Sequence, residues 1–74
     1  MEKVESLGLA ELGRTLADCR KQAKLTQREV GRQIFLSRTS ISRNERGKRD
    51  SGIYDLHHFA NACGFKLTLK VVSA

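Results

Sequence analysis

Apolar side chains recur at three- and four-residue steps in two long segments of the chain, the spacing that places them on one face of a helix. In the first segment the apolar positions are Leu9, Leu12, Leu16 and Cys19. In the second they are Ile53, Leu56, Phe59, Ala60 and Cys63, and Gly64 follows as a helix stop. The pattern predicts one helix from residue 9 to about residue 24 and another that ends at residue 64, after a loose lead-in of residues 1–8.

Two shorter helices are predicted between these segments from residues that cap helix starts. Thr26 precedes Glu29 by three positions, the spacing of a capping box, in which each side chain satisfies a free backbone N–H. Ser37 is a second candidate cap, and the helix that it opens is expected to bury Ile41 and to end at Gly47. Two short helices joined by a tight turn are typical of a helix-turn-helix.

The last segment changes from a helical period to the two-residue period of a strand. Its apolar positions are Phe65, Leu67, Leu69 and Val71, which alternate with Lys66, Thr68 and Lys70. Because a strand alone leaves its backbone groups unpaired, we expect the same strand of a second copy to pair with it antiparallel across a two-fold axis. The alternative is a frayed apolar tail that packs on the helices.

The 74 residues form one small domain whose positive charge is concentrated in the middle. Between Arg14 and Arg49 there are 11 basic and three acidic residues, whereas the rest of the chain has three basic and five acidic residues. This concentration favours a polyanionic partner, most often nucleic acid, over a merely soluble basic surface. The few aromatic residues weigh against single-stranded partners, which are bound by stacking their bases on aromatic rings.

Neither an enzyme nor a membrane protein is indicated by the sequence. The longest apolar run, residues 34–36, is far too short for a membrane span, and no signal peptide is evident, so we expect a soluble cytoplasmic protein. Cys19 and Cys63 are expected to be packed thiols, and the adjacent His57 and His58 point in different directions on a helix. We therefore expect no metal, no cofactor and no catalytic site.

Three stretches in the centre of the chain carry a specific resemblance. They are residues 25–30 (LTQREV), 36–43 (LSRTSISR) and 45–48 (ERGK). Together they closely resemble the lambda-repressor-like helix-turn-helix family, of the Xre and Cro/C1 type, over residues 12–64. The ending, residues 65–72, resembles HipB-type antitoxins, which pair such a strand between protomers. The resemblance implies an all-α, compact four- or five-helix DNA-binding domain at residues 9–64 and a dimerisation strand at residues 65–74.

The helix that starts after Ser37 is expected to contact DNA bases in the major groove. With Ile41 turned inward, the outer side of this helix carries Arg38, Thr39, Ser42 and Arg43. Arginine can form a bidentate bond with guanine, and threonine can contact a thymine methyl group. We predict these four as base-reading residues, with the alternative that an arginine contacts phosphate alone.

Residues that flank this helix are predicted to contact the DNA backbone. Free N–H groups at the start of the preceding helix favour an anion, and the resemblance implies that Gln27 holds a phosphate there. It also implies backbone contacts after the base-reading helix, where the alternative for Lys48 and Arg49 is a solvated loop. The full predicted set is Gln27, Ser37, Ser40, Arg46, Lys48 and Arg49.

The resemblance further implies a structural ion pair between Arg20 and Glu45, which fixes the base-reading helix. The chain departs from the family at two positions. Phe35 stands in the turn where glycine is usual, which predicts either another turn geometry or a strained Phe35. Asn44 stands where an apolar residue is usual, and Phe35 is a candidate to fill the missing volume.

These features predict a sequence-specific repressor that binds duplex DNA as a homodimer, on a palindrome with half-sites roughly 34 Å apart. The ending predicts the autoregulating antitoxin of a type II pair with a HipA-like toxin. Two alternatives stay open: a stand-alone phage, plasmid or restriction-modification control regulator, and a protein-interaction module that neutralises a toxin and binds DNA weakly. Salt distinguishes the last from the others, because affinity for duplex DNA falls steeply as salt rises.

Overall fold

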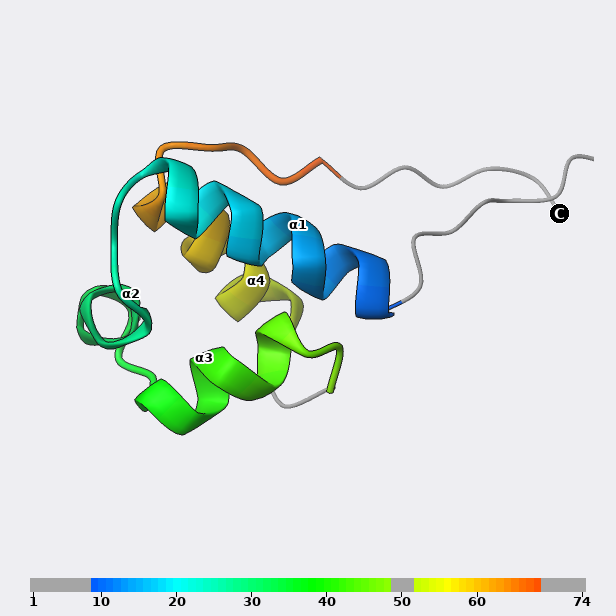
Figure 1. Cartoon of the computed structure of the whole chain (residues 1–74), viewed down its shortest axis with the longest axis horizontal. Coiled ribbons are helices and arrows are strands. Elements are labelled where there is room, and N and C mark those ends of the chain that lie inside the picture. The colour runs from blue at the N-terminus through cyan, green and yellow to red at the C-terminus, as the bar shows by residue number, and fades with distance from the viewer. Residues whose placement is uncertain (1–8, 49–51, 69–74) are drawn as a thin grey trace, which may run out of the picture.

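The computed structural model describes residues 9–48 and 52–68. These residues form four helices, in the order α1 (Leu9–Gln22), α2 (Gln27–Ile34), α3 (Arg38–Glu45) and α4 (Ile53–Ala62). Figure 1 shows α2 end-on, with α3 running from it along one side of the molecule and α1 above. The all-α prediction is confirmed, and within the described ranges the number of helices is four.

One apolar core joins the four helices. Leu16 of α1, Val30 of α2, Ile41 of α3 and Phe59 of α4 are each at most 2% exposed. Three of these positions, Leu16, Ile41 and Phe59, are ones that the helical spacing and the caps predict to face inward. The two thiols belong to the same core, because Cys63 is buried and Cys19 packs against the buried cluster; this burial raises the pKa of both. Each helix therefore contributes at least one buried apolar side chain to the core.

The starts of α2 and α3 are capped as the sequence predicts. The Glu29 N–H donates to Thr26 Oγ1 at 3.0 Å, and the Thr26 N–H donates to Glu29 Oε1 at 2.8 Å, which completes the capping box. The hydrogen bond from the Thr26 backbone lowers the pKa of Glu29. At α3 the Ser40 N–H donates to Ser37 Oγ at 3.1 Å. Both caps fix where the helices begin, and hence how the turn between them is directed.

Helices α1 and α3 approach so closely at Gly13 that only glycine fits. A Cβ atom at this position would lie 2.5 Å from the carbonyl oxygen of Asn44 and 2.6 Å from that of Glu45. Both atoms belong to the backbone of α3, so neither can move aside as a side chain would. Glycine at this position therefore sets the distance between α1 and the carboxyl end of α3.

The turn between α2 and α3 uses a left-handed backbone conformation at Phe35, with φ 62° and ψ 39°. The Leu36 N–H donates to the carbonyl of Gly31 at 2.9 Å and closes the turn. Of the two geometries that the sequence left open, the structure has the strained one. The ring of Phe35 is 93% exposed, so the prediction that it fills volume beside Asn44 is wrong. The cause is local, since the backbone at the end of α2 directs this side chain into solvent.

The segment after α4 does not form a strand over residues 65–68 in this single chain. The Phe65 N–H donates to the carbonyl of Ala60 at 2.9 Å, and Leu67 packs against the core. Phe65 itself is 39% exposed. Leu69 and Val71 lie outside the described residues. A strand exists only through a partner that accepts and donates its backbone hydrogen bonds, so the pairing between two copies stays a prediction.

We expect Gly13→Ser to lower the free energy of unfolding by about 2 kcal/mol, because the added Cβ atom forces two packed helices apart. Denaturant unfolding followed by circular dichroism measures the change. Gly52→Ser is the matched control: a Cβ atom at Gly52 meets nothing within 4 Å, and serine suits this N-cap position of α4. Equal stability of the two variants would contradict the close approach of α1 and α3.

Candidate nucleic-acid interface

Helices α2 and α3 and the turn at residues 35–37 form the unit on which the site is built. Helix α3 buries Ile41 and Asn44 against the rest of the domain. The exposed side chains on its other side are Arg38, Thr39 and Arg43. Ser42 is half-buried, and its carbonyl accepts a hydrogen bond from Arg46 Nε at 3.3 Å. The structure therefore brings three of the four predicted base-reading side chains to the surface and leaves the fourth partly covered.

The carboxyl end of α3 is held by a buried ion pair with α1. Arg20 Nε lies 2.5 Å from Glu45 Oε2, and Arg20 Nη2 donates to Glu45 Oε1 at 3.0 Å. The side chains of Arg20 and Glu45 are only 12% and 7% exposed. The hydrogen bond to Glu45 raises the pKa of Arg20. Two parallel N–H···O bonds fix direction as well as distance, so α3 is oriented relative to α1.

The same ion pair reaches the start of α2. Arg20 Nη1 donates to the carbonyl of Leu25 at 2.9 Å, just before α2, and Gln27 Nε2 donates to Glu45 Oε1 at 3.0 Å. Sequence reasoning placed Gln27 at a phosphate and did not foresee its bond to Glu45. An amide nitrogen carries two protons, so this bond occupies one donor and aligns the other. The network thus ties the amino end of α2 to the carboxyl end of α3.

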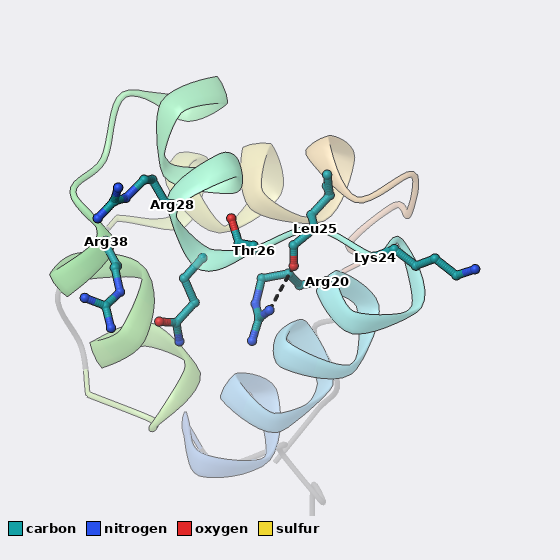
Figure 2. Close-up of a pocket in the computed structure, with 7 residues that line it drawn as sticks. Arg20, Lys24, Leu25, Thr26, Arg28 and Arg38 are labelled. Atoms are coloured by element: carbon teal, nitrogen blue, oxygen red, sulfur yellow. Dashed lines mark hydrogen bonds between the residues drawn. The ribbon is translucent and has the colours of Figure 1, made fainter.

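A hollow of about 610 Å³ opens at the amino end of α2. Its lining residues are Arg20, Lys24, Leu25, Thr26, Gln27, Arg28 and Arg38. Figure 2 draws the side chains that line it, with Arg28 of α2 above Arg38 of α3 and the hydrogen bond from Arg20 to the carbonyl of Leu25 as a dashed line. Cationic side chains around a helix amino end, where backbone N–H groups and the helix dipole already favour negative charge, form an anion-attracting surface.

Comparison with known proteins agrees with this arrangement. The model of a family described as a helix-turn-helix domain matches residues 11–70. The chain belongs to the helix-turn-helix domain family. Domains of this kind bind DNA, and proteins built on them are typically not enzymes. The prediction of a helix-turn-helix DNA-binding protein is therefore confirmed, whereas its finer features, the Xre and Cro/C1 subdivision and the HipB-like ending, stay predictions.

Two solved structures of the clp gene regulator ClgR from Corynebacterium glutamicum are similar to the helix-turn-helix chain. One has a TM-score of 0.76 at 27% sequence identity, and covers 84% of this chain and 66% of its own. The other has a TM-score of 0.76 at 26% identity, and covers 89% of this chain and 85% of its own. The chain thus spans just under two thirds of the first ClgR chain. No curated protein sequence shows a significant match.

The remaining predicted phosphate contacts of the helix-turn-helix lie at both ends of α3. At its start, Ser37 Oγ caps the helix and donates to Ser40 Oγ at 3.2 Å, so both hydroxyl groups already have protein partners. Beyond its end, Arg46 and Lys48 are exposed. The Lys48 N–H donates to the Arg43 carbonyl at 2.9 Å, which fixes the chain where it leaves α3. Arg49 lies outside the described residues.

Sequence reasoning missed two cationic side chains of the hollow, Lys24 and Arg28. Both stood within the basic window, but neither lies on the helix that the resemblance assigned to base contacts. Arg28 was detectable as a first-turn residue beside Gln27. Lys24 was not, because its place depends on the left-handed backbone, φ 59°, with which the chain leaves α1.

Two other classes of site find no support in the residues that the structure describes. No group of three or more histidine, cysteine or acidic residues is placed to hold a metal ion. None of the four helices is long and apolar enough to cross a membrane.

We expect Glu45→Ala to lower the free energy of unfolding by about 3 kcal/mol, because the buried Arg20 guanidinium loses its counter-charge. Chemical denaturation of the purified protein measures this loss. Arg14→Ala removes an exposed charge from the same helix as Arg20 and should change the stability by less than about 0.5 kcal/mol.

The double variant Arg20→Ala/Glu45→Ala should lose less stability than the two single changes together, since no uncompensated charge is left. If the Glu45→Ala variant were as stable as the parent protein, the ion pair with Arg20 would not be what holds α3 against α1.

Proposed function

We propose that this chain is a transcriptional repressor that binds a specific duplex DNA sequence as a homodimer. The observation that carries the proposal is the exposed polar face of α3, which the network of Arg20, Glu45 and Gln27 holds in one orientation. A reading helix gives specificity only if its side chains reach the bases from a fixed position. The likeness to the gene regulator ClgR supports the regulatory role.

The base contacts are assigned to Arg38, Thr39, Ser42 and Arg43. Three of them are exposed on α3, and the amino end of such a helix enters the major groove. Arginine pairs with guanine through two hydrogen bonds, and the methyl group of threonine suits thymine. Among these four residues, Ser42 is the weakest candidate for a base contact, because it is half-buried.

The phosphate contacts are assigned to both ends of α3 and to the hollow at α2. The predicted set is Gln27, Ser37, Ser40, Arg46, Lys48 and Arg49, and the structure adds Lys24 and Arg28 as further candidates. Ser37 and Ser40 are the weakest members, because their hydroxyl groups bond to each other. Contacts of this kind supply affinity and salt dependence rather than base preference.

The homodimer is assigned to residues 65–74, with Phe65, Leu67, Leu69 and Val71 as its apolar positions. Phe65 is partly exposed in the single chain, which leaves apolar surface for a second copy to cover. Two such domains related by a two-fold axis place their α3 helices in successive major grooves, so the DNA site is a palindrome with half-sites roughly 34 Å apart.

The finer biological role that we propose is the autoregulating antitoxin of a type II toxin–antitoxin pair, with a HipA-like toxin as its protein partner and the cytoplasm as its location. It rests on the alternation of apolar and polar residues at 65–72 and on the resemblance that this ending carries. A stand-alone control regulator is the alternative within DNA binding. A toxin-neutralising module that binds DNA weakly is the alternative outside it.

Enrichment of bound duplexes from a random DNA pool, at near-physiological salt, tests the proposal. A palindromic consensus is the expected result. A folded protein that enriches no sequence would overturn sequence-specific binding and leave the protein-interaction module as the better explanation. Adding a HipA-like toxin to the DNA complex then tests the antitoxin role, since a partner toxin would alter the affinity for DNA and a stand-alone regulator would show no response.

We expect Arg38→Ala and Arg28→Ala to weaken DNA binding in different ways. Loss of a base-reading Arg38 should cost about 1–3 kcal/mol on the selected site and relax the preference at one base pair. Loss of Arg28 should weaken binding to all duplexes alike and reduce the slope of log affinity against log salt by about one. Fluorescence anisotropy over a salt series measures both quantities.

Arg14→Ala is the control, because it removes one positive charge from an exposed residue of α1 that belongs neither to the predicted DNA contacts nor to the dimerisation segment. Its affinity and salt slope should match those of the parent protein. If Arg38→Ala weakened all duplexes equally, Arg38 would be a phosphate contact like Arg28.

A further inference from the structure

Phe35 lowers the stability of the fold in two ways at once. Its backbone is left-handed, a conformation that a bulky side chain adopts only with strain. Its ring is 93% exposed, so it returns almost none of the free energy that burial of an aromatic ring gives. Packing therefore gives no reason for an aromatic residue at this position. Strained residues cluster at functional sites, where another interaction accounts for them.

The place of Phe35 in the fold suggests what that interaction is. It lies in the turn between α2 and α3, three positions before Arg38, so the residue is close in the chain to the amino end of the helix that we assign to the major groove. Ile34 and Leu36 on either side both pack against the core, which leaves Phe35 as the exposed apolar residue of this turn.

We propose that Phe35 contacts an apolar group of the duplex at the edge of the major groove, and so contributes to site preference. The inference rests on the proposed function. The apolar groups available there are the C5-methyl of thymine and the carbon atoms of a deoxyribose. Phenylalanine suits both, and contact with a thymine methyl is an established way to distinguish thymine from cytosine.

Charge favours DNA over a protein as the partner of this ring. The cationic neighbours of the turn in sequence are Arg28 and Arg32 on α2 and Arg38 on α3, and all three are exposed. A protein interface of useful size needs a contiguous apolar patch with few charges at its centre. One exposed ring with arginines nearby in the sequence instead suits duplex DNA. Its phosphate backbone is anionic, and it offers apolar groups only at a few defined points.

Three variants and two duplexes test the proposal. Phe35→Asn removes the ring and tolerates the left-handed backbone, Phe35→Leu keeps an apolar side chain, and Phe35→Ala removes the ring but keeps the strain. The duplexes are the selected site and a copy in which deoxyuridine replaces one thymidine other than the one that Thr39 contacts, which removes a single methyl group and keeps base pairing. Anisotropy measures affinity, and thermal unfolding measures stability.

We expect Phe35→Asn to unfold at a higher temperature than both the parent protein and Phe35→Ala, while it binds the selected site about fourfold more weakly, the effect of one lost carbon-group contact. Phe35→Leu should keep most of the affinity. A gain in stability together with a loss of binding excludes misfolding as the cause. Deoxyuridine should weaken the parent protein by a similar factor and leave Phe35→Asn unchanged if the contact is a thymine methyl. If the contact is a deoxyribose, Phe35→Asn weakens binding to both duplexes equally.

The inference fails if Phe35→Asn binds both duplexes as tightly as the parent protein does. It also fails if the variant loses dimerisation in sedimentation while the affinity of each domain for DNA is kept, since the ring would then contact protein. The first result leaves the proposed function unaffected, and the second would add Phe35 to the dimer contact assigned to residues 65–74. Sequence-specific DNA binding itself fails only if the parent protein selects no duplex.

Discussion

The bidentate ion pair between Arg20 and Glu45 is the interaction on which the geometry of the site depends. It joins the last turn of α1 to the last residue of α3, and through Leu25 and Gln27 it also fixes the start of α2. The proposed base contacts and the hollow therefore share one anchor. Gly13 makes the anchor reachable, because it lets α1 lie directly against the carbonyl groups of Asn44 and Glu45.

A pair as buried as this one contributes orientation more than stability. Removal of two charges from water costs free energy that their attraction only partly returns. Here the extra acceptor at Leu25 and the extra donor at Gln27 satisfy groups that would otherwise be buried without partners. An apolar pair of similar volume could hold α1 and α3 together as well, but it would lack the directional bonds that set the rotation of α3.

Local features of the fold could be predicted from the sequence, and features made by distant segments could not. Thr26, Glu29 and Ser37 act within one helix turn, so their spacing was sufficient to predict both caps. The sequence predicted either another turn geometry or a strained Phe35. It could not predict the direction of the Phe35 ring, because that direction depends on the backbone at the end of α2. The hollow could not be predicted because it combines the loop after α1 with α2 and α3, which are separate in the sequence. Residues 65–68 alternate as a strand does, but in the single chain they have no second strand to pair with.

The length of α3 sets the distance between the two groups of cationic side chains at its ends. Eight residues at 1.5 Å each make a helix about 12 Å long, so the two ends of α3 stand about that distance apart. Arg28 and Arg38 stand at its amino end, and Arg46 and Lys48 follow its carboxyl end. Because the anchor at Glu45 fixes the rotation of the helix between these ends, contacts at the two ends would also fix which of its side chains face the bases. In the proposed function, affinity from Arg28, Arg46 and Lys48 and selectivity from the base-reading face would thereby be coupled through the single ion pair.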